Sequence, residues 1–280
     1  IDYRSHIGRW GMPDWWIDHN IQNEEGYSSD LIVNHAIDFI NQHKNRPFFL
    51  YLPFTNIHFP WSTPEDSRYW HEGVDNSPLD RKLGPHSPGS DVTLVVQRMI
   101  QELDRSVGRI VDAVRNEDLE ENTLIFFTSD NGGYIHYEGR HEGQISNNGP
   151  LRGQKAELYE GGIRVPAIAW WPEKIEGGSQ CDQLMLTMDL LPTFLELTGI
   201  PAPPEVSQRA LDGVSLASVF LEKTSLPERT VYWRKSTMKA VREGPWKLVI
   251  DVTSSSGPEL YHLEEDIGES NDLSKEYPEI

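Results

Sequence analysis

Asp130 and Asn131 are the first pair of side chains in this sequence whose types suggest chemistry. They follow the short apolar run Leu124–Phe127 and precede two glycines, Gly132 and Gly133. A carboxylate and a carboxamide supply oxygen ligands, which suit a hard cation such as Ca²⁺ or Mg²⁺. The same residues also fit an Asx-type turn that binds nothing. Asp130 and Asn131 are therefore candidate metal ligands, with a plain turn as the alternative.

His58 and Lys155 are candidates for a site that handles an anionic group. His58 follows the apolar run Pro47–Pro53, and Lys155 lies near Arg152 and Arg164 in a strongly acidic chain. An imidazole and an ammonium group can hold an anion and move a proton. A histidine after a strand is also commonly a structural residue, and a basic cluster is also commonly a solvated surface.

The elements that would position these groups can be read from periodicity. Apolar residues at helical spacing predict helices over residues 27–45 and 92–114. Residues 47–53, 124–127 and 167–171 are short apolar runs typical of strands buried on both faces of a parallel sheet. Helices alternating with strands indicate an α/β fold, in which His58 and Asp130 would lie at the same carboxyl rim.

The remainder of the chain adds a helix and a change of texture. Asp189 can cap a helix that has Pro192 in its first turn and ends before Gly199. The domain prediction is an α/β part over 1–225 and a small antiparallel unit over 226–280. Four short strands are predicted in that unit, at residues 230–234, 239–242, 246–250 and 259–263, with a turn at Glu243-Gly244-Pro245.

Composition excludes several classes of function. The chain has 280 residues, 37% hydrophobic and 25% charged, and no apolar run approaches the length of a membrane helix. A net charge of −19 argues against nucleic acid as a partner. Any anionic substrate must therefore be held by local cations. The single cysteine, Cys181, excludes an internal disulfide.

Several motifs, in order along nearly the whole chain, resemble the sulfatase family of the alkaline-phosphatase-like superfamily. The resemblance is to its arylsulfatase and N-acetylgalactosamine-6-sulfatase-like members. The motifs are Phe48–Phe54 with His58-Phe59-Pro60, Asn122–Gly133, Pro150–Lys155 with Glu160–Pro166, Asp189–Thr193, Asp212–Leu216, and Val241–Val249 with Glu259–Leu263. Each motif alone is weak, but the ordered set is specific.

The resemblance implies a fold, an activity and roles. The fold would be part of an α/β/α sandwich with a mostly parallel sheet, followed by a small antiparallel α+β unit. The activity would be hydrolysis of sulfate monoesters of glycans or aryl compounds with one Ca²⁺. Asp130 and Asn131 match metal ligands, and His58 and Lys155 match catalytic residues that hold the sulfate and assist the leaving oxygen. His136 and His141 lie in a loop expected to contact substrate.

One part of the family pattern is missing from these residues. The family's nucleophile is a formylglycine made from the cysteine of a Cys-x-Pro-Ser-Arg motif, whereas Cys181 is followed by Asp182-Gln183-Leu184. The resemblance therefore implies that this chain is the C-terminal part of a sulfatase. We expect this span alone to be inactive and the nucleophile to lie ahead of residue 1. Export to the periplasm, the lysosome or the exterior is expected from the family alone.

Two other functions remain open from the sequence. A phosphoesterase of the same superfamily would use several His and Asp side chains around two zinc ions, and His136 and His141 leave room for it. A non-catalytic relative that binds sulfated glycans is the second alternative. Bound-metal analysis would separate the first, and a search for the nucleophile motif upstream would separate the second.

Overall fold

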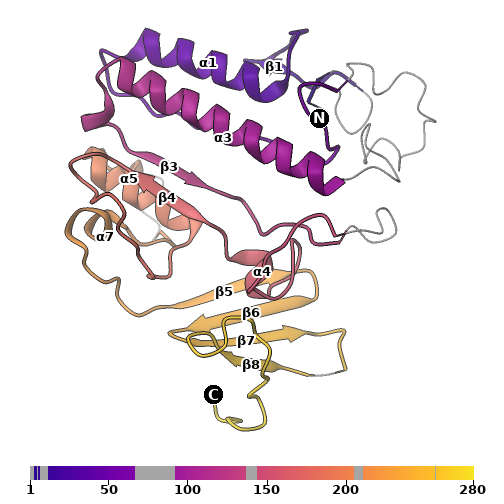
Figure 1. Ribbon diagram of the computed structural model, residues 1–280. Helices are drawn as coiled ribbons and strands as arrows, with labels where there is room; N and C mark the ends of the chain where they lie inside the picture. The colour runs from indigo at the N-terminus through magenta and orange to yellow at the C-terminus, as the bar shows by residue number, and fades with distance from the viewer. Residues whose placement is uncertain are drawn as a thin grey trace. The chain divides into compact units, whose positions relative to one another are not determined.

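The computed structural model describes residues 3–4, 6, 12–66, 92–136, 144–204, 211–255 and 257–280. The chain divides into two compact units. The first comprises residues 1–119 and 133–148, and the second comprises residues 120–132 and 149–280. Elements carry the labels of Figure 1.

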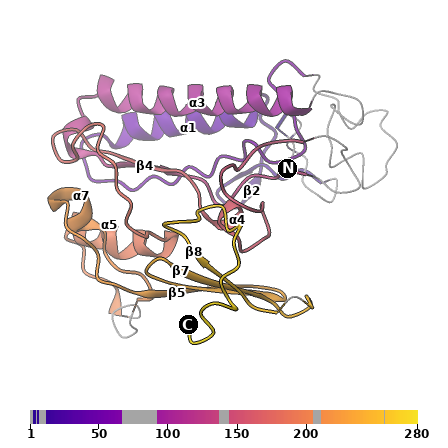
Figure 2. The same ribbon diagram turned by 60° about the horizontal axis from the view of Figure 1, so that its bottom comes forward.

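Two long helices dominate the first unit. Helix α1 spans Ser28–His43 and α3 spans Val92–Asn116, and they lie side by side in both views (Figures 1 and 2). Both helices predicted from periodicity are confirmed. Arg109 on α3 joins the pair through hydrogen bonds to Asp30 at 3.0 Å and to Asn34 at 2.6 Å.

One apolar cluster of the first unit lies at the start of α3. It comprises Tyr3, Tyr27, Trp61, Val92, Val95, Val96, Met99 and Ile145. A short hairpin of β1 (Trp16–Ile17) and β2 (Asn20–Ile21) precedes α1. The long excursion that the sequence indicates over residues 61–89 falls mostly outside the described residues.

The predicted strand at Pro47–Pro53 is wrong. No strand is assigned there, and Phe49 and Tyr51 are 71% and 74% exposed rather than buried. A strand requires a neighbour to complete its hydrogen-bond ladder, and no described segment pairs with these residues. An apolar run indicates only that its side chains favour burial. It does not show that a second strand lies beside it to complete the hydrogen-bond ladder.

Strands β3 (Ile125–Thr128) and β4 (Ala167–Trp170) form the sheet of the second unit that carries the Asp130 turn. Both predicted strands are confirmed, but they pair antiparallel, with Ile125 opposite Trp170. In its described residues the connection between them holds one short helix, α4 (Glu160–Ile163), and antiparallel neighbours need no crossover helix. Ile168 is 60% exposed, so full burial on both faces is not observed.

Two further helices of the second unit accompany this strand pair. Helix α5 spans Leu190–Thr198 after the 3₁₀ turn η3 (Thr187–Asp189), and α7 spans Ala217–Glu222. Gly199 ends α5 with φ of 66°, as the sequence predicts. Asp189 does not cap α5, because its carboxylate instead accepts from Leu186 N–H, Val214 N–H and Arg229.

A four-stranded antiparallel sheet follows near the end of the chain (Figure 1). Its strands are β5 (Thr230–Lys235), β6 (Met238–Glu243), β7 (Trp246–Asp251) and β8 (Glu259–His262). All four predicted strands and the turn through Gly244 are confirmed. Its core also includes Leu158 and Leu263, from segments before and after the strands. The domain boundary near residue 225 remains a prediction.

Candidate functional site

The turn after β3 carries the two candidate metal ligands. Asp130 is exposed and Asn131 is half-buried. The Asn131 side-chain amide donates to the Gly132 carbonyl at 3.1 Å, and Ser129 Oγ donates to the Asn131 carbonyl at 2.9 Å. Among the described residues, none donates a hydrogen bond to the Asp130 carboxylate or to Asn131 Oδ1. Both oxygens are thus available as ligands.

Gly132 fixes this turn against α4. Its N–H donates to the Gly162 carbonyl at 3.0 Å. A Cβ at position 132 would overlap the carbonyl oxygen of Gly161, so only glycine fits this approach. The turn that follows β3 is therefore held by backbone contact with α4.

The loop that carries Lys155 meets the same two glycines of α4. Gly161 N–H donates to the Arg152 carbonyl at 2.6 Å. A Cβ on Gly162 would overlap the carbonyl oxygens of Gln154 and Glu157. Gly161 and Gly162 thus touch both the Asp130–Gly132 turn and the loop over residues 152–157. Within the second unit, the structure brings the surroundings of Asp130, Asn131 and Lys155 against one short segment.

Arg152 and Arg164 stay partly exposed, but both contact partners within the second unit. Arg152 donates to Tyr261 Oη at 2.6 Å and to the Glu269 carbonyl at 2.9 Å, and its guanidinium lies 3.9 Å from the Tyr159 ring centroid. Arg164 lies 3.6 Å from a Glu160 carboxylate oxygen. These contacts assign two of the three cations of this region to internal pairing. Lys155 is half-buried and has an interaction of its own, and its contact with an anion stays a prediction.

His58 is presented by a tightly anchored segment of the first unit. The Tyr3 hydroxyl donates to the carbonyls of Thr55 and His58, the latter at 2.8 Å. Asn56 donates to the Met99 carbonyl on α3 at 3.3 Å. The exposed His58 ring has Nδ1 2.6 Å from the Phe59 carbonyl, which assigns the Nδ1 proton and orients the ring.

His136 and His141 are the two remaining histidine candidates. His136 is exposed in the first unit, and His141 lies outside the described residues. The base of their loop is closed by two hydrogen bonds between Gly133 and Asn148, at 3.1 and 2.9 Å. Their contact with a substrate stays a prediction, as does a meeting of His58 with Asp130.

Asp130 and Asn131 fit a hard cation by chemistry, but only as part of a cage. Ca²⁺ takes roughly six to eight oxygen ligands. In the part of the chain that the structure describes, no group of three or more His, Cys, Asp or Glu side chains could hold a metal. Further ligands would have to come from other residues. Cys181, the only thiol, is exposed and free.

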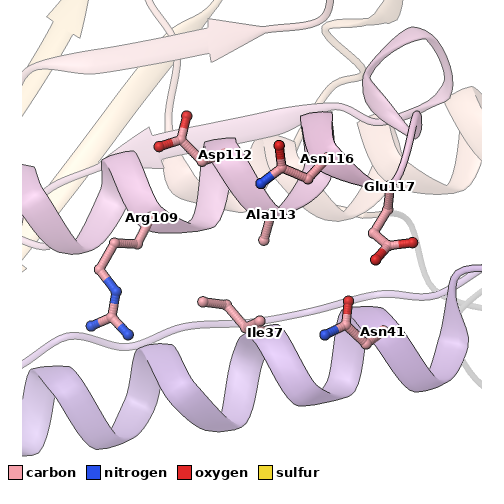
Figure 3. A pocket seen from close by; sticks show the side chains of 7 residues that line it. All are labelled: Ile37, Asn41, Arg109, Asp112, Ala113, Asn116 and Glu117. Atoms are coloured by element: carbon pink, nitrogen blue, oxygen red, sulfur yellow. The ribbon is translucent and has the colours of Figure 1, made fainter.

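A pocket between α1 and α3 is separate from these candidates. Figure 3 shows side chains from both helices around it, and none of the candidate site residues lines it. Its lining residues are Ile37, Asn41, Arg109, Asp112, Ala113, Asn116 and Glu117. Among the described residues, no helix combines the length and the apolar character needed to cross a bilayer.

Two protein-family models match the chain. The sulfatase model matches residues 2–200, and the model of the C-terminal region of N-sulphoglucosamine sulphohydrolase matches residues 154–279. The second match begins at the Lys155 loop and includes α4 and the four-stranded sheet. One family model thus covers both the Lys155 loop and the antiparallel sheet.

Curated relatives agree with the models. N-acetylgalactosamine-6-sulfatase of Rattus norvegicus is 33% identical over 230 residues, which are 81% of this chain and 39% of that protein. N-acetylgalactosamine-6-O-sulfatase of Bacteroides thetaiotaomicron is 26% identical over 288 residues, which are 96% of this chain and 50% of that protein. The chain thus spans half or less of the length of these relatives.

The fold agrees as well. The solved structure of Ps i-CgsB in complex with k-i-k-neocarrahexaose matches with a TM-score of 0.76 and 25% identity, over 96% of this chain and 56% of that chain. The described residues contain both helices and sheets, and the match of this fold over 96% of the chain confirms the predicted α/β class. The ordered motifs, the family model over most of the chain and this fold lead to one conclusion: the chain belongs to the sulfatase family.

Proposed function

We propose that the full-length protein containing this chain is a sulfuric-ester hydrolase. Membership of the sulfatase family supports a sulfate monoester as the substrate. The observation that carries the proposal for this chain is the contact of both the Asp130–Asn131 turn and the Lys155 loop with Gly161 and Gly162. This arrangement joins oxygen ligands for a cation with an ammonium group on one structural unit.

Asp130 and Asn131 would supply two oxygen ligands to a divalent cation, which we propose is Ca²⁺. The cation would stabilise negative charge on the sulfate oxygens. Lys155 would hold a sulfate oxygen and provide a proton to the alcohol as the ester S–O bond breaks. His58, oriented by its hydrogen bond to Phe59, would hold a second oxygen of the group.

The nucleophile is proposed to lie outside residues 1–280. The family pattern requires a formylglycine made within Cys-x-Pro-Ser-Arg, and Cys181 is followed by Asp182-Gln183-Leu184. We therefore propose that the span described here hydrolyses no sulfate ester by itself. A sequence ahead of Ile1 that lacks the motif would favour a non-catalytic glycan-binding relative instead.

The substrate is proposed to be a sulfated glycan. The relatives in rat and in Bacteroides thetaiotaomicron are named for N-acetylgalactosamine 6-sulfate, and Ps i-CgsB was solved with a neocarrahexaose. His136 and His141, in the loop beside Gly133, are the proposed contacts for the sugar. Export of the protein is proposed from the family alone, and fractionation of cells that express the full gene would test it.

The test uses the full-length protein. Sulfate release is measured from N-acetylgalactosamine 6-sulfate, sulfated galactan oligosaccharides and p-nitrophenyl sulfate, beside phosphate release from p-nitrophenyl phosphate. We expect sulfate release and bound calcium. Faster phosphate release with two bound zinc ions would instead support the phosphoesterase, and glycan binding without turnover would support the non-catalytic relative.

Two variants locate the chemistry on this chain. Asp130→Asn and Lys155→Ala are each expected to lower kcat for sulfate release by about 100-fold or more, since they remove charge that acts on the reacting group. Lys174→Ala, at an exposed position of the same unit, is the matched control and should keep wild-type kcat. Full activity of Asp130→Asn or Lys155→Ala would contradict the assigned roles.

A further inference from the structure

Three ionisable side chains lie buried together in the second unit. Glu160 begins α4, Lys247 lies on β7, and Glu269 lies in the segment after β8. Their exposed fractions are 2%, 0% and 0%. Charged groups are almost never fully buried unless they are paired. We call these three residues the buried triad.

The buried triad forms a continuous set of contacts. Lys247 Nζ lies 2.8 Å from Glu160 Oε1 and 2.8 Å from Glu269 Oε1. The second carboxylate oxygen of Glu269 accepts the backbone N–H of Glu160 at 2.6 Å. Lys247 thus bridges both carboxylates, and Glu269 also holds the backbone at the start of α4.

Glu269 is the centre of this arrangement. Its carbonyl accepts from Arg152 at 2.9 Å, at the start of the Lys155 loop, while its side chain accepts from the first N–H of α4. Its φ of 49° is in the left-handed region that non-glycine residues rarely adopt. Such a conformation persists where the surroundings over-determine it. One residue therefore holds both the Lys155 loop and α4.

Helix α4 connects the contacts of Glu269 to the backbone of the candidate site. Gly161 and Gly162 follow Glu160 directly, and their carbonyls contact Gly132 behind the Asp130–Asn131 turn. Gly161 N–H also reaches the Arg152 carbonyl. Displacement of Glu160 would therefore move backbone that contacts the metal-binding turn and the Lys155 loop together.

We propose that Glu160, Lys247 and Glu269 are positioning residues, which set the backbone of α4 and thereby the placement of Asp130, Asn131 and Lys155. This inference rests on the proposed function of those three site residues. The four-stranded sheet then also contributes to the site, because Lys247 on β7 is the cation that contacts both carboxylates of the buried triad.

Stability alone is a poor explanation of the buried triad. Desolvation of buried ion pairs often cancels their attraction, and well-packed apolar residues can replace them without loss. Burial raises the pKa of the Glu269 carboxyl, with Glu160 adding to this and Lys247 opposing it. A charged Glu269 would therefore carry a free-energy cost. Residues that orient metal ligands and catalytic side chains contribute to function, and this contribution can offset such a cost.

The test compares Glu269→Gln and Glu160→Gln with Asp189→Asn in the full-length protein. Asp189 is the matched control, because it is also a fully buried carboxylate of the second unit that is paired with a cation, Arg229. Its contacts hold the segments around α5 and α7 rather than α4. All three substitutions exchange a carboxyl group for an amide of similar shape.

Three readouts are measured at a temperature where every variant is folded. They are amide hydrogen exchange in peptides covering residues 129–134 and 160–163, the Kd for Ca²⁺, and kcat with KM for sulfate release. We expect faster exchange in both peptides for Glu269→Gln and Glu160→Gln. We also expect a rise in the Ca²⁺ Kd and a fall in kcat of about 10- to 100-fold, with a smaller change in KM.

The control separates positioning from general loosening. Asp189→Asn should lower the melting temperature at least as much, while exchange in the two peptides, Ca²⁺ Kd and kcat stay at wild-type values. Equal changes in Asp189→Asn would overturn the proposal, as would unchanged exchange and Ca²⁺ Kd in folded Glu269→Gln. If Glu269→Gln does not fold, Glu160→Gln decides by the same criteria, since it leaves the Glu269 backbone contacts in place.

The outcome that contradicts the proposed function differs from the outcome that contradicts the positioning role. Wild-type protein that releases no sulfate overturns the proposed function, and hydrogen exchange at Gly132 then decides the positioning by itself. Wild-type protein that releases sulfate, with both triad variants indistinguishable from it in exchange and kcat, overturns the positioning alone.

Discussion

The two units hold their candidate site residues by different physics. In the first unit, the segment around His58 is held by an apolar cluster and by hydroxyl groups, such as Tyr3 and Tyr27, that donate to backbone carbonyls. In the second unit, the Asp130 turn and the Lys155 loop are held by close glycine contacts and buried ion pairs. One arrangement is neutral and the other is charged.

This difference indicates how pH and the removal of single charges should affect each unit. Burial raises the pKa of both Tyr3 and Tyr27, so their hydroxyls stay protonated at any physiological pH. Among carboxyls of the second unit, the pKa of Glu269 is raised while that of Asp189 is lowered. The contacts of Glu269 and Asp189 in the second unit should therefore depend on pH, and those of the Tyr3 and Tyr27 hydroxyls in the first unit should not.

The largest effect is expected for Gly132→Ala. The added methyl group would overlap the Gly161 carbonyl oxygen, and backbone cannot move aside as a side chain can. We expect a loss of about 3 kcal/mol in the free energy of unfolding, at the upper end for overpacking. Denaturant unfolding of the full-length protein measures it.

The control for this substitution is Gly108→Ala on α3. A Cβ there meets nothing within 4 Å, so the change should stabilise the helix by up to about 1 kcal/mol. Equal stabilities of the two variants would show that the contact between Gly132 and α4 does not constrain the fold.

Asp189→Asn should destabilise the second unit nearly as much. Arg229 donates to both carboxylate oxygens, at 2.8 and 2.6 Å, and the side chain of Asp189 is fully buried. Removal of one member of a buried ion pair costs about 3 kcal/mol. Thermal unfolding measures the loss, and exposed Asp182→Asn should leave the melting temperature unchanged. A neutral Asp189→Asn would make the buried pair irrelevant to stability.

The contribution of Asp189 should vanish in acid. Burial alone would raise its pKa, but hydrogen bonds from Arg229, Val214 N–H and Leu186 N–H outweigh it and lower the pKa below the ordinary 3.8. A lowered pKa in the folded state adds stability that is complete above the unfolded value and is lost as pH falls through the folded value. The stability difference between wild type and Asp189→Asn should therefore shrink below about pH 4. A constant difference down to pH 2 would contradict this assignment.

A smaller effect, independent of pH, is expected for Tyr27→Phe in the first unit. The hydroxyl donates to the buried Ser62 carbonyl at 2.8 Å. The loss of one such hydrogen bond costs about 1 kcal/mol. Unfolding measured from pH 5 to pH 9 should show the same loss throughout, whereas Tyr232→Phe, at a side chain that is 74% exposed, should show none. A loss that varies over this range would remove the distinction between the units.

The smallest effect is expected for Lys223→Ala. Lys223 pairs with Glu176 on the surface, where their side chains are 65% and 63% exposed. Solvent screens such a pair, so the melting temperature should match that of wild type within measurement error. A clear drop would mean that surface pairs, and not only buried ones, stabilise the second unit.

Much of the fold could be predicted from local pattern. Helices α1 and α3 follow from apolar residues at helical spacing, and β5–β8 follow from short apolar segments separated by turns. The position of Asp130 and Asn131 directly after a strand also follows from local sequence. Periodicity reports which side chains are buried, and this depends only on neighbours along the chain.

The sequence by itself determined the helices, most strands, the family and the candidate residues. Tertiary structure decided the partners: Arg152 with Glu269, Lys247 with Glu160, and the Asp130 turn with the glycines of α4. It also decided that residues 47–53 form no strand and that Asp189 pairs with Arg229 instead of capping a helix. These contacts join residues far apart along the chain, and a local pattern carries no information about which distant group completes a hydrogen bond or neutralises a buried charge.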